Sequence, residues 1–78
     1  MEKFRKTVEE IFTDYFLMEI LDADYSKPFE EVGLDLLDQV DLIMQIERTF
    51  NLSIPDDECE KFVTIDDIGR YMSSVGIV

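Results

Sequence analysis

The chain has 78 residues, of which 46% are hydrophobic, and its 19 acidic against 7 basic residues give a net charge of −12. This length predicts one small domain, residues 1–78, and the apolar content excludes a disordered chain despite the charge. This charge repels nucleic acid and anionic membrane, so neither is expected as a partner, and it favours basic protein surfaces. No apolar run approaches the roughly 20 residues of a membrane span, so the sequence predicts no membrane span.

The residues available for chemistry argue against an enzyme. The chain has no histidine, no metal-ligand cluster and no phosphate-cradling glycine loop, and its single cysteine, Cys59, lacks a base to activate it. Cys59 also cannot form an internal disulfide, which favours a reducing compartment. We therefore expect a cytoplasmic protein with neither a catalytic site nor a metal site.

Residues 2 to about 20 are predicted to form the first helix. Apolar side chains recur there at spacings of three and four, which favours one buried face. They are Phe4, Val8, Ile11, Phe12, Tyr15 and Phe16. The spacing favours a core role for the aromatic ones. Residues 22–34 contain several turn formers and are predicted to be a loop, whose Phe29 and Val32 pack onto the core.

A second helix is predicted from Leu36 to about Phe50, with Asp35 as its N-cap and Asp38 in its first turn. Its apolar residues form two adjoining stripes that together span about 220° of the helix. The first stripe is Leu42, Ile43, Ile46 and Phe50, and the second is Leu36, Leu37, Val40 and Met44. Two interpretations fit: either the whole face is core, or the second stripe is exposed as a docking surface beside a row of acids.

Two further helices complete the predicted fold. Pro55 and the three acids after it suit the first turn of a short helix over residues 56–61. Thr64, with Asp67 three residues later, is predicted to cap the last helix, and Gly76 to end it. No segment alternates like a strand. We expect an all-α fold with three main helices and one short helix.

The stretch over residues 32–38 resembles the attachment site of acyl carrier proteins. In that family a Gly-x-Asp-Ser-Leu motif places a serine at the start of the second helix, and this serine carries a 4'-phosphopantetheine arm. Gly33, Asp35 and Leu37 match the motif, but Leu36 stands at the serine position. Further residues follow the family pattern at family spacing. They are Phe29, Val32, Leu34, Asp38, Val40, Asp41, Leu42, Ile46, Glu47, Phe50, Ile54, Pro55, Thr64 and Tyr71.

The resemblance implies an acyl-carrier-like bundle and a carrier role in fatty-acid, polyketide or related acyl metabolism. It also implies that the second helix docks on basic surfaces of acyl-chain synthases, acyltransferases or a phosphopantetheinyl transferase. The implied docking residues are Asp35, Leu37, Asp38, Val40, Asp41, Met44 and Glu47. Arg48 departs from the acid that is common near that point, which would weaken or redirect some docking.

Leu36 conflicts with the carrier role, because the arm is joined through a hydroxyl oxygen that leucine lacks. No other serine matches the motif, so no cofactor is expected on this chain. Two explanations fit. A serine codon becomes a leucine codon by one base change, so Leu36 is an engineered or accidental replacement in a working carrier. Alternatively, the chain is a carrier-like interaction or regulatory module that lost the arm. An exposed Leu36 would extend the apolar second stripe, so we expect a monomer or weak self-association.

Overall fold

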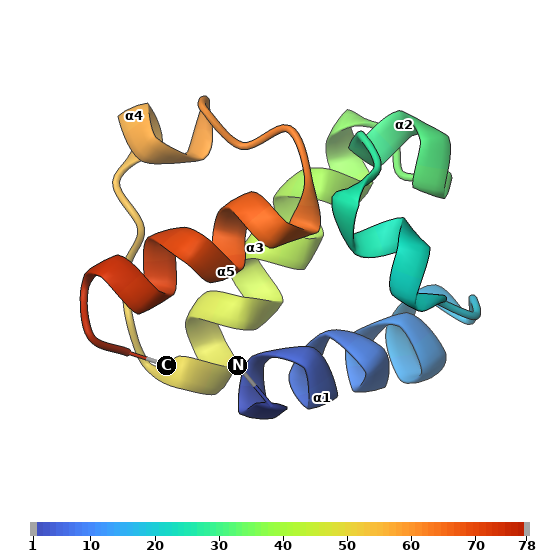
Figure 1. Ribbon diagram of the computed structural model, residues 1–78, viewed down its shortest axis with the longest axis horizontal. Coiled ribbons are helices and arrows are strands. Elements are labelled where there is room, and N and C mark those ends of the chain that lie inside the picture. The colour runs from blue at the N-terminus through green and yellow to red at the C-terminus, as the bar shows by residue number, and fades with distance from the viewer. Residues whose placement is uncertain (1, 78) are drawn as a thin grey trace.

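The computed structural model describes residues 2–77, which form an all-α fold (Figure 1). The three main helices are α1 (Glu2–Ile11), α3 (Leu36–Phe50) and α5 (Ile65–Ser74). The shorter segments are the π-helical η1 (Phe12–Phe16), the 3₁₀-helical η2 (Asp22–Ser26), α2 (Phe29–Val32) and α4 (Asp56–Cys59). No strand occurs within residues 2–77. The all-α prediction is confirmed, but the structure has two short α-helices, α2 and α4, where one was expected.

The first helical segment ends at Phe16, earlier than the predicted end near residue 20. The chain passes from α1 into η1, and then Leu17 takes a left-handed conformation with φ 56° and ψ 43°. The N–H groups of Leu17 and Met18 both donate to the carbonyl of Phe12, the second over 2.8 Å. This reversal stops the helix without the glycine or proline that usually signals a helix end. The predicted boundary was therefore wrong.

The region predicted as a loop contains η2 and α2. Phe29 is buried and Val32 half-buried, so the prediction that both pack onto the core is confirmed. Gly33, at φ 99°, ends α2, and the Leu34 N–H donates to the Phe29 carbonyl over 3.0 Å. This left-handed turn is the conformation that glycine adopts at least cost. It directs Leu34 into the core and Asp35 to the start of α3.

The last helix begins and ends as predicted. The Asp67 N–H donates to Oγ1 of Thr64 over 3.1 Å, and the Thr64 N–H donates to Oδ2 of Asp67 over 3.0 Å. This reciprocal pair satisfies two N–H groups that a helix start leaves unbonded. At the other end Gly76 has φ 78°, and the Ile77 N–H donates to the Met72 carbonyl over 2.9 Å.

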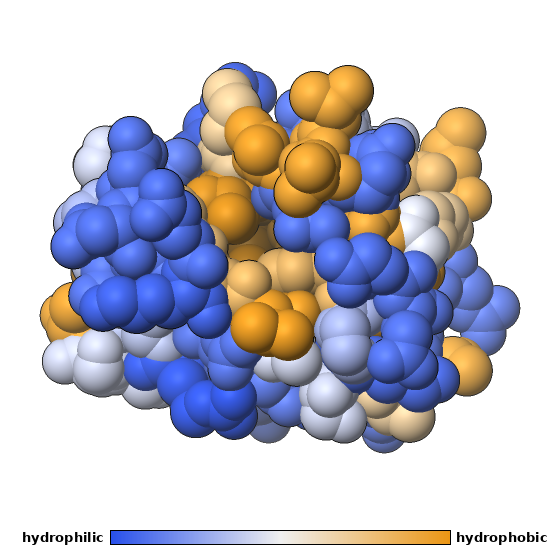
Figure 2. Space-filling view, turned by 90° about the horizontal axis from the view of Figure 1, so that it is seen from above, coloured by the Kyte–Doolittle hydropathy of each residue, from blue (hydrophilic) through white to orange (hydrophobic). Residues whose placement is uncertain are grey.

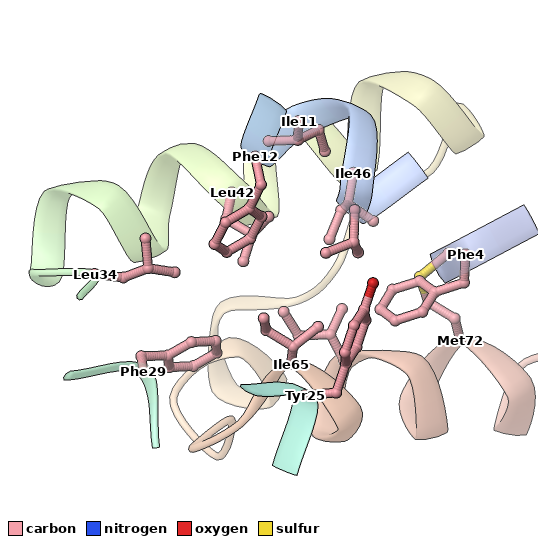
Figure 3. Packing of buried hydrophobic residues seen from close by; sticks show 12 residues of the cluster. Phe4, Ile11, Phe12, Tyr25, Phe29, Leu34, Leu42, Ile46, Ile65 and Met72 are labelled. Atoms are coloured by element: carbon pink, nitrogen blue, oxygen red, sulfur yellow. The ribbon is translucent and has the colours of Figure 1, made fainter. Parts of the chain in front are cut away.

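The core lies between the three main helices, whose buried side chains point toward one another (Figure 3). Its fully buried members are Phe4, Val8, Phe12, Leu34, Leu42, Ile46, Ile65, Ile68 and Met72. Tyr25 of η2 closes the core beside α1, where its hydroxyl donates to the Arg5 carbonyl over 3.3 Å. The Arg5 guanidinium lies 4.0 Å from the centre of the Tyr25 ring. These contacts anchor the long connection between α1 and α3.

Candidate functional site

The start of α3 is fixed by a reciprocal pair of hydrogen bonds. The Asp38 N–H donates to Oδ1 of Asp35 over 2.9 Å, and the Asp35 N–H donates to Oδ2 of Asp38 over 3.3 Å. The two carboxylates also lie at the positive end of the helix dipole, which favours negative charge there. The Gln39 side chain adds a bond from Nε2 to the Leu34 carbonyl over 3.2 Å. The segment that contains Leu36 is therefore held in one conformation by its neighbours.

The second apolar stripe of α3 faces outward. The exposed fractions are 77% for Leu36, 77% for Leu37, 53% for Val40 and 49% for Met44. Leu42 and Ile46, on the first stripe, are fully buried. The interpretation that the second stripe is exposed is confirmed. Figure 2 shows apolar side chains gathered on this end of the molecule, with hydrophilic surface on either side, over α4 and over α2.

Each remaining predicted docking acid has a hydrogen bond within the chain. Oδ2 of Asp41 accepts a bond from the Tyr15 hydroxyl over 3.2 Å. Oε2 of Glu47 accepts a bond from the Ile54 N–H over 2.6 Å, so this half-buried carboxylate also holds the connector after α3. Both acids thus have fixed positions along the helix.

Tyr15 lies at this site, although its helical spacing predicts a core residue, and that prediction is wrong. Its side chain is 51% exposed and its hydroxyl reaches Asp41 of α3. The hydrogen bond to Asp41, followed by the negative charges of Asp41 and Asp38, raises the pKa of the Tyr15 hydroxyl. The wide turn of η1 changes which side of the helix Tyr15 faces. The only signal in the sequence is the Tyr15 hydroxyl, which is the one polar group in a stripe that is otherwise apolar.

An apolar groove of about 300 Å³ opens beside the exposed stripe, between α3 and α4. It is lined by Val40, Ile43, Met44, Glu47, Ile54, Asp56 and Cys59. Partial burial, together with the negative charges of Glu47 and Asp56, raises the pKa of the Cys59 thiol. A thiol with a raised pKa is mostly protonated at neutral pH and is a poor nucleophile. Cys59 therefore contributes an apolar wall rather than a reactive group.

In the described part of the chain, the acids at the start and along α3 form no ion pair. Within residues 2–77 the ion pairs are Arg5–Asp22, Lys27–Asp24, Lys61–Glu58 and Arg70–Asp67. None of these pairs includes Asp35, Asp38, Asp41 or Glu47. The exposed stripe is therefore bordered by acids without ion-pair partners, which attract basic surfaces.

Over the same residues, the structure brings together no group of three or more side chains able to hold a metal ion. The helices of this part of the chain also lack the combination of length and apolarity that crossing a membrane requires.

The comparison with protein families matches this architecture to one class. A family model described as "Phosphopantetheine attachment site" matches residues 6–72, which include all of α3 and most of α1 and α5. The chain belongs to this family, whose acyl carrier members are carriers rather than enzymes. The family's group is 4'-phosphopantetheine.

Curated relatives give the more particular likeness. The chain is 47% identical over 49 residues to a protein of Wolinella succinogenes named "Acyl carrier protein". These 49 residues cover 63% of this chain and 64% of the relative. A protein of the same name from Campylobacter concisus is 45% identical over 51 residues, 65% of this chain and 66% of the relative. Another protein of this name, from Campylobacter jejuni strain RM1221, is 41% identical over 59 residues, which cover 70% of this chain and 77% of the relative. The chain thus spans just under two thirds of the first two relatives.

The residues at the start of α3 do not fit the family's group. The side chain of Leu36 ends in methyl groups and has no oxygen to join to a phosphate. The serines of the chain lie elsewhere, at positions 26, 53, 73 and 74. Ser26 is in η2, where its hydroxyl donates to the Ala23 carbonyl, and Ser53 lies beyond the far end of α3. The motif position therefore lacks the nucleophile that the attachment chemistry requires.

Proposed function

We propose that this chain is an acyl-carrier-type module that docks on partner enzymes through α3 and carries no phosphopantetheine arm. The observation that carries the proposal is Leu36, which occupies the serine position of the motif and is 77% exposed on the first turn of α3. A hydroxyl at this place would be open to a modifying enzyme, whereas a leucine offers no atom for a phosphodiester bond. The change removes the chemistry and leaves the helix start and its acids in place.

The proposed docking surface consists of Asp35, Leu37, Asp38, Val40, Asp41, Met44 and Glu47. It is supported by the exposure of its apolar members and by the absence of any ion pair to its acids among the described residues. An apolar centre with a charged border is typical of transient interfaces. The partners that suit it are acyl-chain synthases, acyltransferases or a phosphopantetheinyl transferase of fatty-acid, polyketide or related acyl metabolism. The proposal treats residues 1–78 as one domain that acts in the cytoplasm.

A second candidate function is that of an interaction or regulatory module that the enzymes recognising acyl carriers no longer bind. Arg48 favours it, because this exposed base interrupts the acidic border of α3. In that case the apolar stripe would be kept, but the enzymes that recognise carriers would not bind it. The two candidates differ in what a carrier-dependent enzyme does with the chain, so binding separates them.

The test is isothermal titration calorimetry of the chain against a purified acyl-chain synthase from Campylobacter jejuni. The proposal predicts binding that weakens as salt is raised, because exposed charges are screened. Asp41→Lys should weaken binding about tenfold. The matched control is Glu9→Lys on α1, which changes the net charge by the same amount away from α3 and should bind like the unchanged chain. Absence of binding, or equal binding of both variants, would overturn the docking surface.

A further inference from the structure

Leu36 is exposed without a structural reason. It is the first residue of α3, but the reciprocal bonds that start this helix come from Asp35 and Asp38. Its side chain is 77% exposed, as is that of Leu37 beside it, so neither contributes much to the core. Two adjacent leucines that the fold leaves in water form the kind of apolar patch that marks an interaction site.

The surroundings of this pair indicate the chemistry of what would cover it. Asp35 and Asp38 lie at the start of α3 beside the pair, and acids begin the short helices that precede and follow α3 in the chain. These are Glu30 and Glu31 in α2, and Asp56, Asp57 and Glu58 in α4. In the part of the chain that the structure describes, only Glu58 of all these acids has an ion pair. Figure 2 shows an apolar area between two hydrophilic regions of the surface, one over α2 and one over α4.

We propose that Leu36, with Leu37, is an apolar anchor that inserts into a pocket of a partner protein whose rim carries lysine and arginine side chains. This rests on the proposed function, since it assumes that α3 is the docking helix. It differs from that function in one respect: the residue at the attachment position is itself a source of affinity. Burying these exposed leucines in a partner's pocket removes their apolar surface from water, which favours binding, and the surrounding acids select basic partners.

The charge favours this occupant over a second copy of the chain. A pairing of two such faces would bring two acidic rims together, within a dimer of two chains that each carry −12. Like charges opposed across an interface lower affinity, whereas a basic rim raises both affinity and the rate of encounter. A basic partner protein is therefore a better occupant of the patch over the two leucines than a second copy of this chain.

The experiment extends the same calorimetric titration with the C. jejuni acyl-chain synthase to a Leu36 series. Leu36→Ala removes most of the apolar side chain without creating a hydroxyl and should weaken binding at least tenfold. Leu36→Met keeps the apolar volume and should stay within about threefold of the unchanged chain. Val75→Ala trims an exposed aliphatic residue at the opposite end, after α5, and should have no effect.

Each outcome bears on the anchor separately from the docking surface. If the unchanged chain binds and Leu36→Ala binds equally well, docking stands and the anchor is wrong. If the unchanged chain does not bind, the proposed function fails and the anchor with it. Sedimentation of the chain alone provides the remaining arm: a dimer that Leu36→Ala dissociates would assign the patch to a second copy and overturn the proposal.

Discussion

The Tyr15 hydroxyl donates to Oδ2 of Asp41 over 3.2 Å and thereby joins the π-helical end of the first helix to the acidic face of α3. Asp41 is an implied docking acid, and Tyr15 limits the positions its carboxylate can take. The hydrogen bond also links the charge of α3 to a spectroscopic signal, because a tyrosine absorbs differently when it ionises. The contact can therefore be tested in the free protein.

The pKa of Tyr15 should fall when Asp41 is neutralised. The hydrogen bond to Asp41 and then its negative charge raise this pKa above the ordinary value of about 10. Asp41→Asn removes the charge, so Tyr15 should ionise at lower pH than in the unchanged chain. The measurement is an absorbance titration, with Tyr15→Phe subtracted to isolate this residue from Tyr25 and Tyr71. An unchanged titration in Asp41→Asn would contradict the contact.

Replacement of Leu17 by glycine should stabilise the fold. Leu17 has φ 56°, a conformation that costs a residue with a side chain about 1 kcal/mol and costs glycine little. Its side chain is 81% exposed, so little packing is lost. We expect Leu17→Gly to raise the free energy of unfolding by about 0.5–1 kcal/mol in urea titrations. Leu17→Ala, which keeps the backbone cost, is the control and should give no gain. A loss in Leu17→Gly would show that this side chain is needed.

The carboxylate of Asp67 should stabilise the fold at neutral pH and lose this effect as the pH becomes acidic. Partial burial opposes its ionisation, but bonds from the Val63 and Thr64 N–H groups and from Arg70 outweigh this and lower the pKa of Asp67. A carboxyl with a lowered folded-state pKa contributes fully above its ordinary pKa of about 4, and this contribution is lost as pH falls through the folded value. Asp67→Asn should therefore cost about 1 kcal/mol at pH 7 and progressively less below about pH 4.

Urea titrations of Asp67→Asn and the unchanged chain across this pH range measure the difference. Asp57→Asn, at an exposed position in α4, is the control and should change the free energy of unfolding by less than about 0.5 kcal/mol at pH 7. A penalty for Asp67→Asn that stays constant from pH 7 to pH 3 would contradict the assigned role of the charge.

Truncation to alanine should lower the free energy of unfolding strongly at one leucine of α3 and hardly at another. Leu42 is fully buried, so Leu42→Ala leaves a cavity and should cost about 2–5 kcal/mol, enough to unfold much of a small domain. Leu36 is 77% exposed, and Leu36→Ala should change the free energy of unfolding by less than about 0.5 kcal/mol. Thermal and urea unfolding followed by circular dichroism measure both. A large loss in Leu36→Ala would mean that this leucine serves the fold.

The features that the sequence predicted are those decided by neighbouring residues. Asp35 with Asp38, and Thr64 with Asp67, lie three residues apart, and this spacing alone allows the reciprocal bonds at each helix start. Gly76 ends α5 because glycine takes the left-handed turn at little cost. Such signals need no knowledge of the rest of the fold.

The features that escaped prediction depend on packing between distant segments. Nothing next to Leu17 in the sequence requires a left-handed residue, and the change to a π-helical turn that moves Tyr15 toward Asp41 is equally hidden. Periodicity also showed two apolar stripes on α3 without deciding whether the other helices cover the second stripe or leave it exposed. The bond from the Ile54 N–H to Glu47 depends on the path of the connector after α3, which the residue pattern does not specify.

We propose that Leu36 blocks attachment of the arm on an otherwise competent docking helix, and intact-mass measurement tests this most directly. The chain and its Leu36→Ser variant would each be incubated with coenzyme A and a broad-specificity phosphopantetheinyl transferase. We predict that Leu36→Ser gains the mass of the phosphopantetheine arm and that the unchanged chain does not. If neither gains it, the docking surface has also diverged from the family. A gain of the arm by the unchanged chain would contradict the account, because another residue would then be the attachment site.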